Sequence, residues 1–423
     1  MEQSSIERVR IAVVGSGIAG LTCAHQLAPH AEVVLYEGSD RLGGHTNTIS
    51  VEDPHAGTLG VDTGFIVHNR ENYPGFTSML DELDVATQPS EMSLAVTDRA
   101  RGFSYRATNP NTIFADRRNL VRGDMWKMLL GIRRFWRDAH RFMETSDDDV
   151  TLGDLLAAGN YPESFVEWHL RPMVAAIWSA APTELERASA LDTLHFLDNH
   201  GLLGLGGRPR WRTVVGGSRT YVDAIIDRFE GKVQTGWQVR AVIRTEDGVD
   251  IVTDVGRERY DCVVLACHSD QALRLIDRPT DDERSVLGSI GYQPNTAVLH
   301  TDQRRLPPMR RAWAAWNVDV DTVADDAERV RVTYDLTTLQ RLPTEVHYLV
   351  SLNPREVDPD HVIATIDYAH PVLDQQARRA QRRLGTINGA DRLYFCGAWA
   401  GHGFHEDGVS AAHDVCRLLG VPA

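Results

Sequence analysis

Three glycines near the start of the chain have the spacing that lets a backbone lie against a dinucleotide. Gly15, Gly17 and Gly20 follow a short apolar run and open a segment of helical composition. The first suits a tight turn, the second leaves room for a pyrophosphate, and the third lets the helix pack on the strand. The N-terminus of such a helix attracts phosphates. A second apolar run ends on Glu37, whose carboxylate can accept hydrogen bonds from a ribose. The sequence therefore predicts a dinucleotide site on a strand–helix–strand unit.

Composition sets limits on where this chain works and what it binds. Its 423 residues exceed the usual size of one domain, so we expect two. The net charge of -15 argues against nucleic acid as a partner. The sequence offers no apolar run long enough to span a membrane, and its polar start shows no secretory signal. Five scattered cysteines favour buried, reduced thiols in a cytoplasmic protein and predict no metal site.

The stretch after the first acid carries a family resemblance. Arg41 precedes the pair Gly43 and Gly44, an arrangement that resembles the flavin amine oxidase and phytoene desaturase superfamily, whose members bind FAD. The resemblance implies that Arg41 contacts the FAD phosphates or ribose and that the glycine pair lets backbone pass close to the flavin. Most members place an arginine after this pair, whereas this chain has His45. Gly64 matches a glycine of the superfamily that lies next to the flavin.

Two later blocks extend the resemblance over nearly the whole chain. Val239 matches the residue that holds the adenine through its backbone. Near the C-terminus, a strand ends at Gly397 and a helix is expected to begin near Gly408. In the superfamily, the N-terminus of this helix points at the flavin pyrimidine ring and would stabilise negative charge on the reduced flavin. The implied positions for noncovalent FAD are Gly15, Gly17, Ile18, Ala19, Gly20, Glu37, Gly38, Arg41, Gly43, Gly44, His45, Gly64, Val239, Gly397, Asp407, Gly408 and Val409.

Residues 403–408, Gly-Phe-His-Glu-Asp-Gly, narrow the resemblance further. They are similar to a subgroup of predicted FAD-binding proteins that is also found fused ahead of plant cyclopropane fatty-acid synthases. Related bacterial proteins accompany methyltransferases that modify unsaturated acyl chains. The resemblance to this subgroup implies an apolar, lipid-like substrate.

The order of the blocks predicts an α/β fold class with a divided domain arrangement. We expect a Rossmann-like FAD-binding domain of the amine oxidase type, formed by residues 1–94, 206–270 and 371–423. Residues 95–205 and 271–370 would form a discontinuous α+β substrate domain. The first of these two segments is expected to be mostly helical, because Trp, Leu and Met recur in it at helical spacing. The glycine-rich stretch 201–209 follows a helical pattern, so we interpret it as a hinge near the substrate entrance and not as a second dinucleotide site.

Lysines are scarce in this chain, and their positions bear on the chemistry. Many amine oxidases of the superfamily place a lysine near flavin N5 on a strand of the substrate domain. The lysines here are Lys127 and Lys232, and residues 233–423 contain none. Oxidation of an amine by the usual arrangement is therefore disfavoured.

Proton transfer would then fall to other side chains near the C-terminus and the first glycine pair. We expect His405 to be the main candidate, with Glu406, His402 and His45 as its neighbours. A histidine with a pKa near neutrality suits proton donation to a carbon centre. The alternative is that these side chains only shape the flavin pocket.

Residues 117–141 carry the sharpest charge feature. They contain seven arginines and Lys127 against Asp124 and Asp138, in a chain that is acidic as a whole. Apolar side chains that include Trp126, Phe135 and Trp136 recur at helical spacing. Such a helix can lie on an anionic membrane surface, where Trp126, Phe135 and Trp136 would enter the interface, or it can contact an acidic partner, for which a lipid methyltransferase is a candidate. The alternative is a solvated helix with its apolar face in the core.

Three functions stay open from the sequence. The first is an FAD-dependent oxidoreductase that reduces or desaturates a carbon–carbon bond of a fatty acyl or lipid substrate. Reduction needs an electron donor, for which NADPH visiting the flavin is the candidate. The second is an amine or amino-acid oxidase that uses oxygen. The third is a flavin-binding accessory subunit of a lipid methyltransferase. We expect a cytoplasmic protein, peripheral at the membrane if the 117–141 segment docks there.

Overall fold

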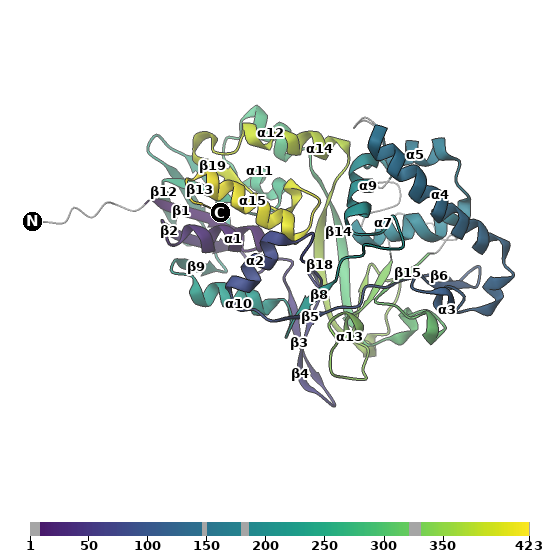
Figure 1. Ribbon diagram of the computed structural model, residues 1–423. Coiled ribbons are helices and arrows are strands. Elements are labelled where there is room, and N and C mark those ends of the chain that lie inside the picture. The colour runs from purple at the N-terminus through teal and green to yellow at the C-terminus, as the bar shows by residue number, and fades with distance from the viewer. Residues whose placement is uncertain (1–8, 146–149, 179–185, 321–330, 423) are drawn as a thin grey trace, which may run out of the picture.

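The computed structural model describes residues 9–145, 150–178, 186–320 and 331–422. The chain forms two lobes, and the C-terminus lies in the same lobe as the N-terminal strand (Figure 1). Several segments that are distant in sequence meet where the lobes join, so a site at this junction would contain residues from several parts of the chain.

A parallel sheet forms the centre of the first lobe. Its strand order is β19-β13-β1-β2-β9, and the neighbouring strands pair in parallel. Alternate residues of β1 enter opposite cores: Ile11 and Val13 face one, and Ala12 and Val14 the other. Burial on both faces is the reason why the inner strands β1, β2 and β13 contain continuous apolar runs, whereas the edge strand β9 does not. The strands are β1 (Arg10–Val14), β2 (Glu32–Glu37), β9 (Lys232–Thr235), β13 (Cys262–Leu265) and β19 (Leu393–Phe395).

Helices cover one face of this sheet. The helix α1 (Ile18–Leu27) packs along α15 (His405–Leu418), so the two ends of the chain share a core. The helices α2 (Pro74–Glu82) and α10 (Arg219–Arg228) complete this layer. The strand–helix–strand unit predicted around the three glycines is therefore present, and the predicted α/β fold class is confirmed.

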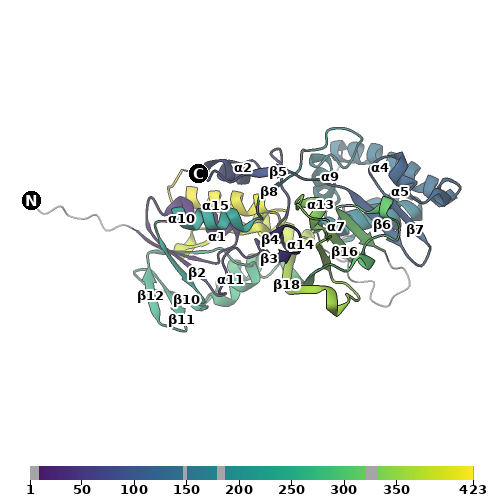
Figure 2. The same ribbon diagram turned by 90° about the horizontal axis from the view of Figure 1, so that it is seen from below.

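A small antiparallel sheet and three helices cover the other face (Figure 2). The sheet contains β10 (Val239–Arg244), β11 (Val249–Thr253) and β12 (Arg257–Tyr260). The helices are α11 (Ser269–Leu275), α12 (Asp281–Leu287) and α14 (Gln375–Arg382). The predicted boundary at residue 270 separates α11 and α12 from this core, although Ala272, Val286 and Leu287 are buried in it. Their packing favours a boundary after α12, while the predicted division into domains stays a prediction.

The second lobe contains a seven-stranded sheet in the order β18-β14-β17-β16-β15-β6-β7. The long strands β14 and β18 pair in antiparallel fashion and run between the lobes (Figure 1). The strand β15 pairs in parallel with β6, although their sequence positions are far apart. The strands are β6 (Leu94–Asp98), β7 (Phe103–Arg106), β14 (Gly291–His300), β15 (Trp316–Asp319), β16 (Val332–Asp335), β17 (Leu349–Leu352) and β18 (Val362–Val372).

Helices between residues 110 and 199 pack on this sheet through an aromatic-rich core, so the mostly helical character predicted for 95–205 is confirmed in the described part of that segment, apart from the strands β6 and β7 at its start. They are α3 (Pro110–Ile113), α4 (Gly123–Thr145), α5 (Leu152–Gly159), α6 (Glu163–Phe165), the π-helical turn η2 (Val166–Leu170), α7 (Arg171–Trp178) and α9 (Ala190–Asn199). The other elements are the hairpin β3 (Thr48–Asp53) and β4 (Gly57–Asp62), the pair β5 (Thr87–Pro89) and β8 (Arg212–Val214), and α13 (Leu336–Leu339). In the part of the chain that the structure describes, we find no helix with the length and apolar character needed to cross a bilayer.

The basic segment 117–141 forms a short 3-10 turn followed by α4, and its apolar residues point in two directions. Phe135 is 2% exposed in the core, so the prediction that it enters a membrane interface is wrong. Trp136 is partly buried and lies against the same core. Trp126 and Leu130, by contrast, are 48% and 67% exposed.

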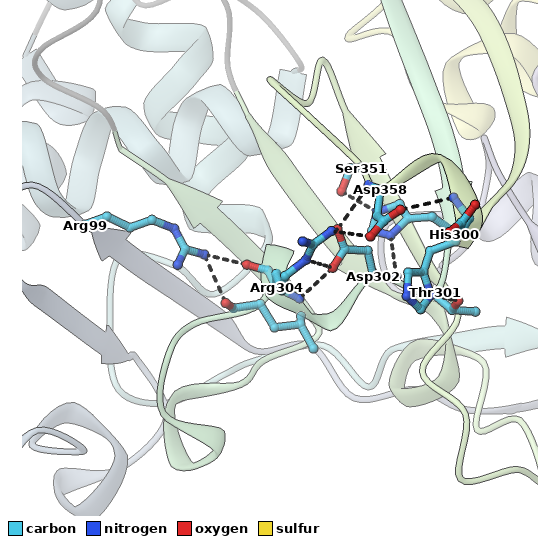
Figure 3. A network of polar contacts seen from close by, with 10 residues as sticks. Arg99, His300, Thr301, Asp302, Arg304, Ser351 and Asp358 are labelled. Atoms are coloured by element: carbon cyan, nitrogen blue, oxygen red, sulfur yellow. Dashed lines mark hydrogen bonds and ion pairs between the residues drawn. The ribbon is translucent and has the colours of Figure 1, made fainter.

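A network of polar contacts connects residues of β14 and β17 with the loops that follow β14 and precede β18 (Figure 3). At the end of β14, His300 Nε2 lies 2.8 Å from Ser351 Oγ, and its Nδ1 accepts a hydrogen bond from the Asp302 amide. Arg304 hydrogen-bonds to Asp302 and forms an ion pair with Asp358 at 3.0 Å. These bonds hold the pKa of Asp302 well below its usual range. The network secures the scaffold and lies apart from the cavity described next, since none of these residues lines it.

Candidate active site

One connected cavity of about 1280 Å³ runs between the lobes. One end lies at the carboxyl ends of β1 and β2, where parallel sheets usually bind ligands. The other end reaches between the seven-stranded sheet and the helices α4, α7 and α9. Its volume exceeds the roughly 300–1,000 Å³ of most single-ligand pockets, so it can hold a large cofactor together with a substrate.

The three glycines at the first end each meet a different physical demand. Gly15 has φ +103°, and a Cβ there would lie 2.9 Å from the carbonyl oxygen of Ala266. A Cβ on Gly20 would lie 1.8 Å from the carbonyl oxygen of Gly15, so the close packing of α1 on the turn requires glycine. A Cβ on Gly17 would meet no atom within 4 Å, because this residue faces the open cavity. The turn has the shape that the sequence predicted for a pyrophosphate cradle.

Glu37 ends β2 beside this cradle, and its carboxylate is already positioned. One oxygen accepts hydrogen bonds from the Ser16 amide and hydroxyl at 3.0 and 2.6 Å. The other accepts from the Ser39 amide and hydroxyl at 2.9 and 3.0 Å. Because the side chain also lines the cavity, it can accept further hydrogen bonds from a ribose.

We expect Glu37→Gln to weaken dinucleotide binding by about 1.5–3 kcal/mol, since charge-assisted hydrogen bonds to a ribose would be lost. Equilibrium titration of the protein with FAD measures this change. The matched control is Glu230→Gln, which removes the same charge from an exposed position outside the cavity. A dissociation constant that is the same for both variants and the parent protein would contradict the ribose role.

Most of the predicted cofactor positions line the cavity, and some do not. Those that line it are Gly15, Gly17, Ile18, Ala19, Glu37, Gly38, Gly43, Gly44, His45, Gly64, Val239 and Gly397. Those outside the lining are Gly20, Arg41, Asp407, Gly408 and Val409.

Arg41 holds a loop together and does not face the cavity. Its guanidinium donates to the carbonyl oxygens of Leu42, Gly44 and Thr46 at 3.2, 2.7 and 2.8 Å. Arg41 therefore fixes the turn that presents Gly44, and its predicted contact with the cofactor stays a prediction. A Cβ on Gly44 would lie 3.2 Å from Gly17 Cα, which shows how closely the two loops meet.

The C-terminal helix begins earlier than the sequence suggested. α15 starts at His405 and not near Gly408, and Gly403, Phe404 and His405 bring its N-terminus to the cavity. Gly408 packs α15 onto α1, since a Cβ there would lie 2.7 Å from Ile18 Cγ2. Asp407 and Val409 are likewise absent from the cavity lining, and the predicted cofactor contacts of Asp407, Gly408 and Val409 stay predictions. Asp407 accepts a hydrogen bond from the Phe404 amide, and Val409 is fully buried.

His45 presents a buried polar atom without a protein partner. Its Nε2 makes no hydrogen bond within the described ranges, and the side chain lines the cavity. The ring stacks on Tyr368 with centroids 4.7 Å apart. Burial holds the pKa of His45 well below its usual value, so the imidazole is neutral near pH 7. A buried polar atom at a cavity wall is normally satisfied by a ligand or water.

His405 differs from what the sequence suggested. Its Nε2 lies 3.2 Å from Thr46 Oγ1 and 3.1 Å from Tyr221 Oη, and its ring stacks on Phe65 at 3.5 Å. Burial lowers the pKa of His405 to about 3. The expectation of a pKa near neutrality is wrong, because a cationic imidazole would lose its hydration here without gaining a carboxylate. His405 lies at the cavity wall as a neutral, hydrogen-bonded ring.

Two of the three proposed neighbours of His405, Glu406 and His402, have other partners. Both carboxylate oxygens of Glu406 accept backbone hydrogen bonds, from Gly75 at 2.8 Å and Phe76 at 2.9 Å. Glu406 therefore caps the N-terminus of α2 and does not line the cavity. His402 does line it, but Arg378 lies 2.7 Å from its Nδ1, and burial lowers the pKa of His402 to about 4.

Sequence reasoning missed a second set of side chains around His45. His370 lies 5.2 Å and His268 6.1 Å from it between ring centroids, and Tyr292 stacks on His268 at 4.4 Å. These residues come from β18, the N-cap of α11 and β14, and they belong to no short motif. The only signal was that Tyr368 and His370 are two residues apart on one strand and so share a face.

The sequence model of the family described as flavin containing amine oxidoreductase matches residues 18–317. The chain belongs to this family. The matched range extends from the first helix of the dinucleotide turn into the seven-stranded sheet, and it contains lining residues from both ends of the cavity.

Relatives of this family member have different substrates in their names. The protein named flavin-containing monoamine oxidase AofH of Mycobacterium tuberculosis is 26% identical over 269 residues, which are 61% of this chain and 56% of AofH. The match thus spans about half the length of that relative.

Solved structures share the fold of this family member over almost its whole length. The CLA-producing fatty acid isomerase from P. acnes has a TM-score of 0.69 at 14% identity, covering 98% of this chain and 99% of the isomerase. Cyclohexylamine oxidase from Brevibacterium oxydans has a TM-score of 0.66 at 16% identity, covering 98% and 100%. These similarities extend the fold assignment to the whole chain.

The cavity of this family member fits the flavin that membership implies. The open space at Gly17, the positioned carboxylate of Glu37 and the side chain of His45 all belong to the lining of this cavity. Gly64 packs directly against the backbone of His45, since a Cβ there would be 2.1 Å from the His45 carbonyl oxygen. When bound, FAD supplies the redox chemistry. These residues would hold its phosphates, ribose and ring, and the neutral histidines would add no charge beside it.

The second end of the cavity is an apolar arm. Its walls are mainly aromatic and aliphatic, from Trp136, Met173, Ile177, Trp178, Phe196, Trp211, Trp316, Tyr334 and Val350. Lys127 and Lys232 are absent from the lining. Among the described lining residues the only carboxylate is Glu37, which lies at the dinucleotide end.

Proposed function

We propose that this protein is an FAD-dependent oxidoreductase that reduces or desaturates a carbon–carbon bond of a fatty acyl or lipid chain. The observation that carries the proposal is the apolar arm, whose described lining contains neither a lysine nor a carboxylate. An acyl chain gains about 0.8 kcal/mol for each methylene buried in such an arm. An amine is a cation near pH 7 and would lose its hydration there without a counter-charge.

Further support comes from the resemblance of residues 403–408 to FAD-binding proteins associated with methyl-branched and cyclopropane fatty acids. For the reductive direction we propose NADPH as a transient electron donor. We place the protein in the cytoplasm, with a peripheral membrane contact through α4 that is argued in the Discussion.

Amine or amino-acid oxidation is the second candidate. Family membership and the name of AofH favour it, and aromatic walls can hold a cation through their ring faces. A third candidate, an accessory subunit of a lipid methyltransferase, would show no turnover without its partner.

Anaerobic mixing separates these candidates. The FAD-loaded protein is mixed first with NADPH and then with unsaturated acyl chains, and in parallel with a panel of amines and amino acids. We expect NADPH to bleach the flavin absorbance and the acyl chain to restore it, while the amines leave the oxidised spectrum unchanged. Rapid bleaching by an amine would replace the lipid proposal with the oxidase. An inert flavin in both series would favour the accessory subunit.

A further inference from the structure

The charged side chains that line the cavity differ in whether they have hydrogen-bond partners within the protein. Besides Glu37 they are four arginines. Arg274 donates to Asp270 at 2.7 Å, and Arg212 donates to the hydroxyl and carbonyl oxygens of Thr87, both at 2.7 Å. Two lining arginines are left, Arg208 and Arg210.

Arg208 and Arg210 make no hydrogen bond or ion pair with any residue that the structure describes. Both are exposed and both line the cavity, so they lie at its mouth. The chain has 59 acidic and 44 basic residues, and most of its arginines could therefore find an acidic neighbour. Ion pairing within the protein therefore does not account for the two guanidinium groups of Arg208 and Arg210 beside the apolar arm.

Both ends of the segment that carries these arginines are anchored. At its start, the Leu202 amide donates to the Leu197 carbonyl at 2.8 Å, and Leu203 is 3% exposed. At its end, Arg212 exchanges two backbone hydrogen bonds with His68, at 2.8 and 2.9 Å. The His200 ring stacks on Trp211 with centroids 5.8 Å apart, which joins the two ends. The segment that carries the two arginines is therefore tied to the scaffold on both sides.

We propose that Arg208 and Arg210 form a subsite for the anionic head group, a carboxylate or a phosphate, of the long-chain substrate whose tail fills the apolar arm. This inference rests on the proposed function. A guanidinium group can donate two parallel hydrogen bonds to a carboxylate or to a phosphate. Because both arginines are exposed, binding costs little desolvation of their charges. Anchoring the head at the mouth fixes how far along the tail the carbon at the flavin end lies. The pair thus selects the position of the reacting bond as well as the class of substrate.

Binding to the FAD-loaded protein tests the subsite without any turnover. The probes share one chain length and differ in the head group: dodecanoate, dodecyl phosphate and dodecan-1-ol, each below its micelle concentration. The readout is the intrinsic tryptophan fluorescence, because Trp136, Trp178, Trp211 and Trp316 line the cavity. The variant is Arg208→Gln with Arg210→Gln. The control is Arg240→Gln with Arg278→Gln, which removes the same charge from exposed positions outside the lining.

We expect the variant to bind at least one of the two anions about tenfold more weakly than the parent protein, and the alcohol with unchanged affinity. The anion that loses affinity identifies the source of the head group, a free acid or a phosphate ester. Added salt should weaken anion binding to the parent protein but not to the variant. Arg208→Lys with Arg210→Lys should keep part of the affinity, since the charge stays and the fork is lost.

Equal affinities of parent and variant for all three probes would overturn the subsite and leave the apolar arm in place. If none of the three probes binds to the parent protein, both the subsite and the proposed lipid function are overturned.

Discussion

Gly17→Leu is expected to produce a folded protein that contains no FAD. The backbone at Gly17 has φ -65°, which any residue adopts, and a Cβ there meets no protein atom within 4 Å. A leucine side chain would therefore cause no strain in the chain and would project into the pyrophosphate cradle. Steric exclusion should remove binding altogether, in contrast to the partial loss expected for Glu37→Gln. The measurements are the flavin absorbance of the purified protein and titration with added FAD.

Gly385→Leu is the matched control, because a Cβ at Gly385 also meets no atom within 4 Å and this residue lies outside the cavity lining. Both variants should unfold at the same temperature as the parent apoprotein. A yellow Gly17→Leu protein with parental affinity for FAD would show that the pyrophosphate lies elsewhere. Flavin that stays on the denatured parent chain would contradict noncovalent binding alone.

The dinucleotide end could be predicted from the sequence because its geometry is local. Gly15 and Gly20 are required by the path of a single turn, Gly17 leaves the space beside that turn open, and Glu37 follows at the tip of the neighbouring parallel strand. Backbone sterics and strand order decide such features, and both can be inferred from spacing.

The chemistry of the histidines could not be predicted in this way. Burial of His405 between Phe65 and Tyr221 brings together segments that are distant in sequence, and it is burial that shifts the pKa. Glu406 is a similar case, because its partners are the backbone amides at the start of α2. The sequence shows which side chains can titrate but not what surrounds them, so candidate catalytic residues are less certain than a cofactor cradle.

The helix α4 has one face in the core and another face exposed on the surface, and the residues of the two faces are interleaved in its sequence. Met125, Met128, Gly131, Phe135 and Ala139 recur at intervals of three or four residues and are buried. Trp126, Leu130, Arg133 and Arg137 also recur at intervals of three or four residues, one or two positions after these, and lie on the outer face. The sequence pattern predicted an amphipathic helix correctly, and the structure shows that its core-facing stripe includes Phe135. The exposed face has its own apolar and basic residues.

We propose that this outer face docks on an anionic membrane surface. Just before α4, Leu120 and Val121 are 47% and 89% exposed, next to the exposed Trp126 and Leu130. Isolated exposed apolar residues need no explanation, but here they adjoin a run of arginines in an acidic protein. Apolar side chains that enter the interface and cations that meet the head groups are the two components of peripheral binding. A surface-bound enzyme would receive a long-chain substrate directly from the lipid.

Charge reversal at Arg133, Arg134 and Arg137 is expected to abolish salt-sensitive binding to anionic vesicles. Each basic residue near such a surface contributes about 1 kcal/mol, so losing three should weaken binding by about a hundredfold. Arg134 and Arg137 also pair with Asp138, at 3.4 and 3.1 Å, which reduces their share and makes Arg133 the main contributor. Co-sedimentation with anionic and neutral vesicles at low and high salt measures the effect. Reversal of Arg219, Arg240 and Arg278 makes the same change in net charge on other surfaces and should leave binding intact. If the parent protein does not sediment with anionic vesicles at low salt, direct docking is wrong, and the substrate must reach the cavity in solution or on a carrier.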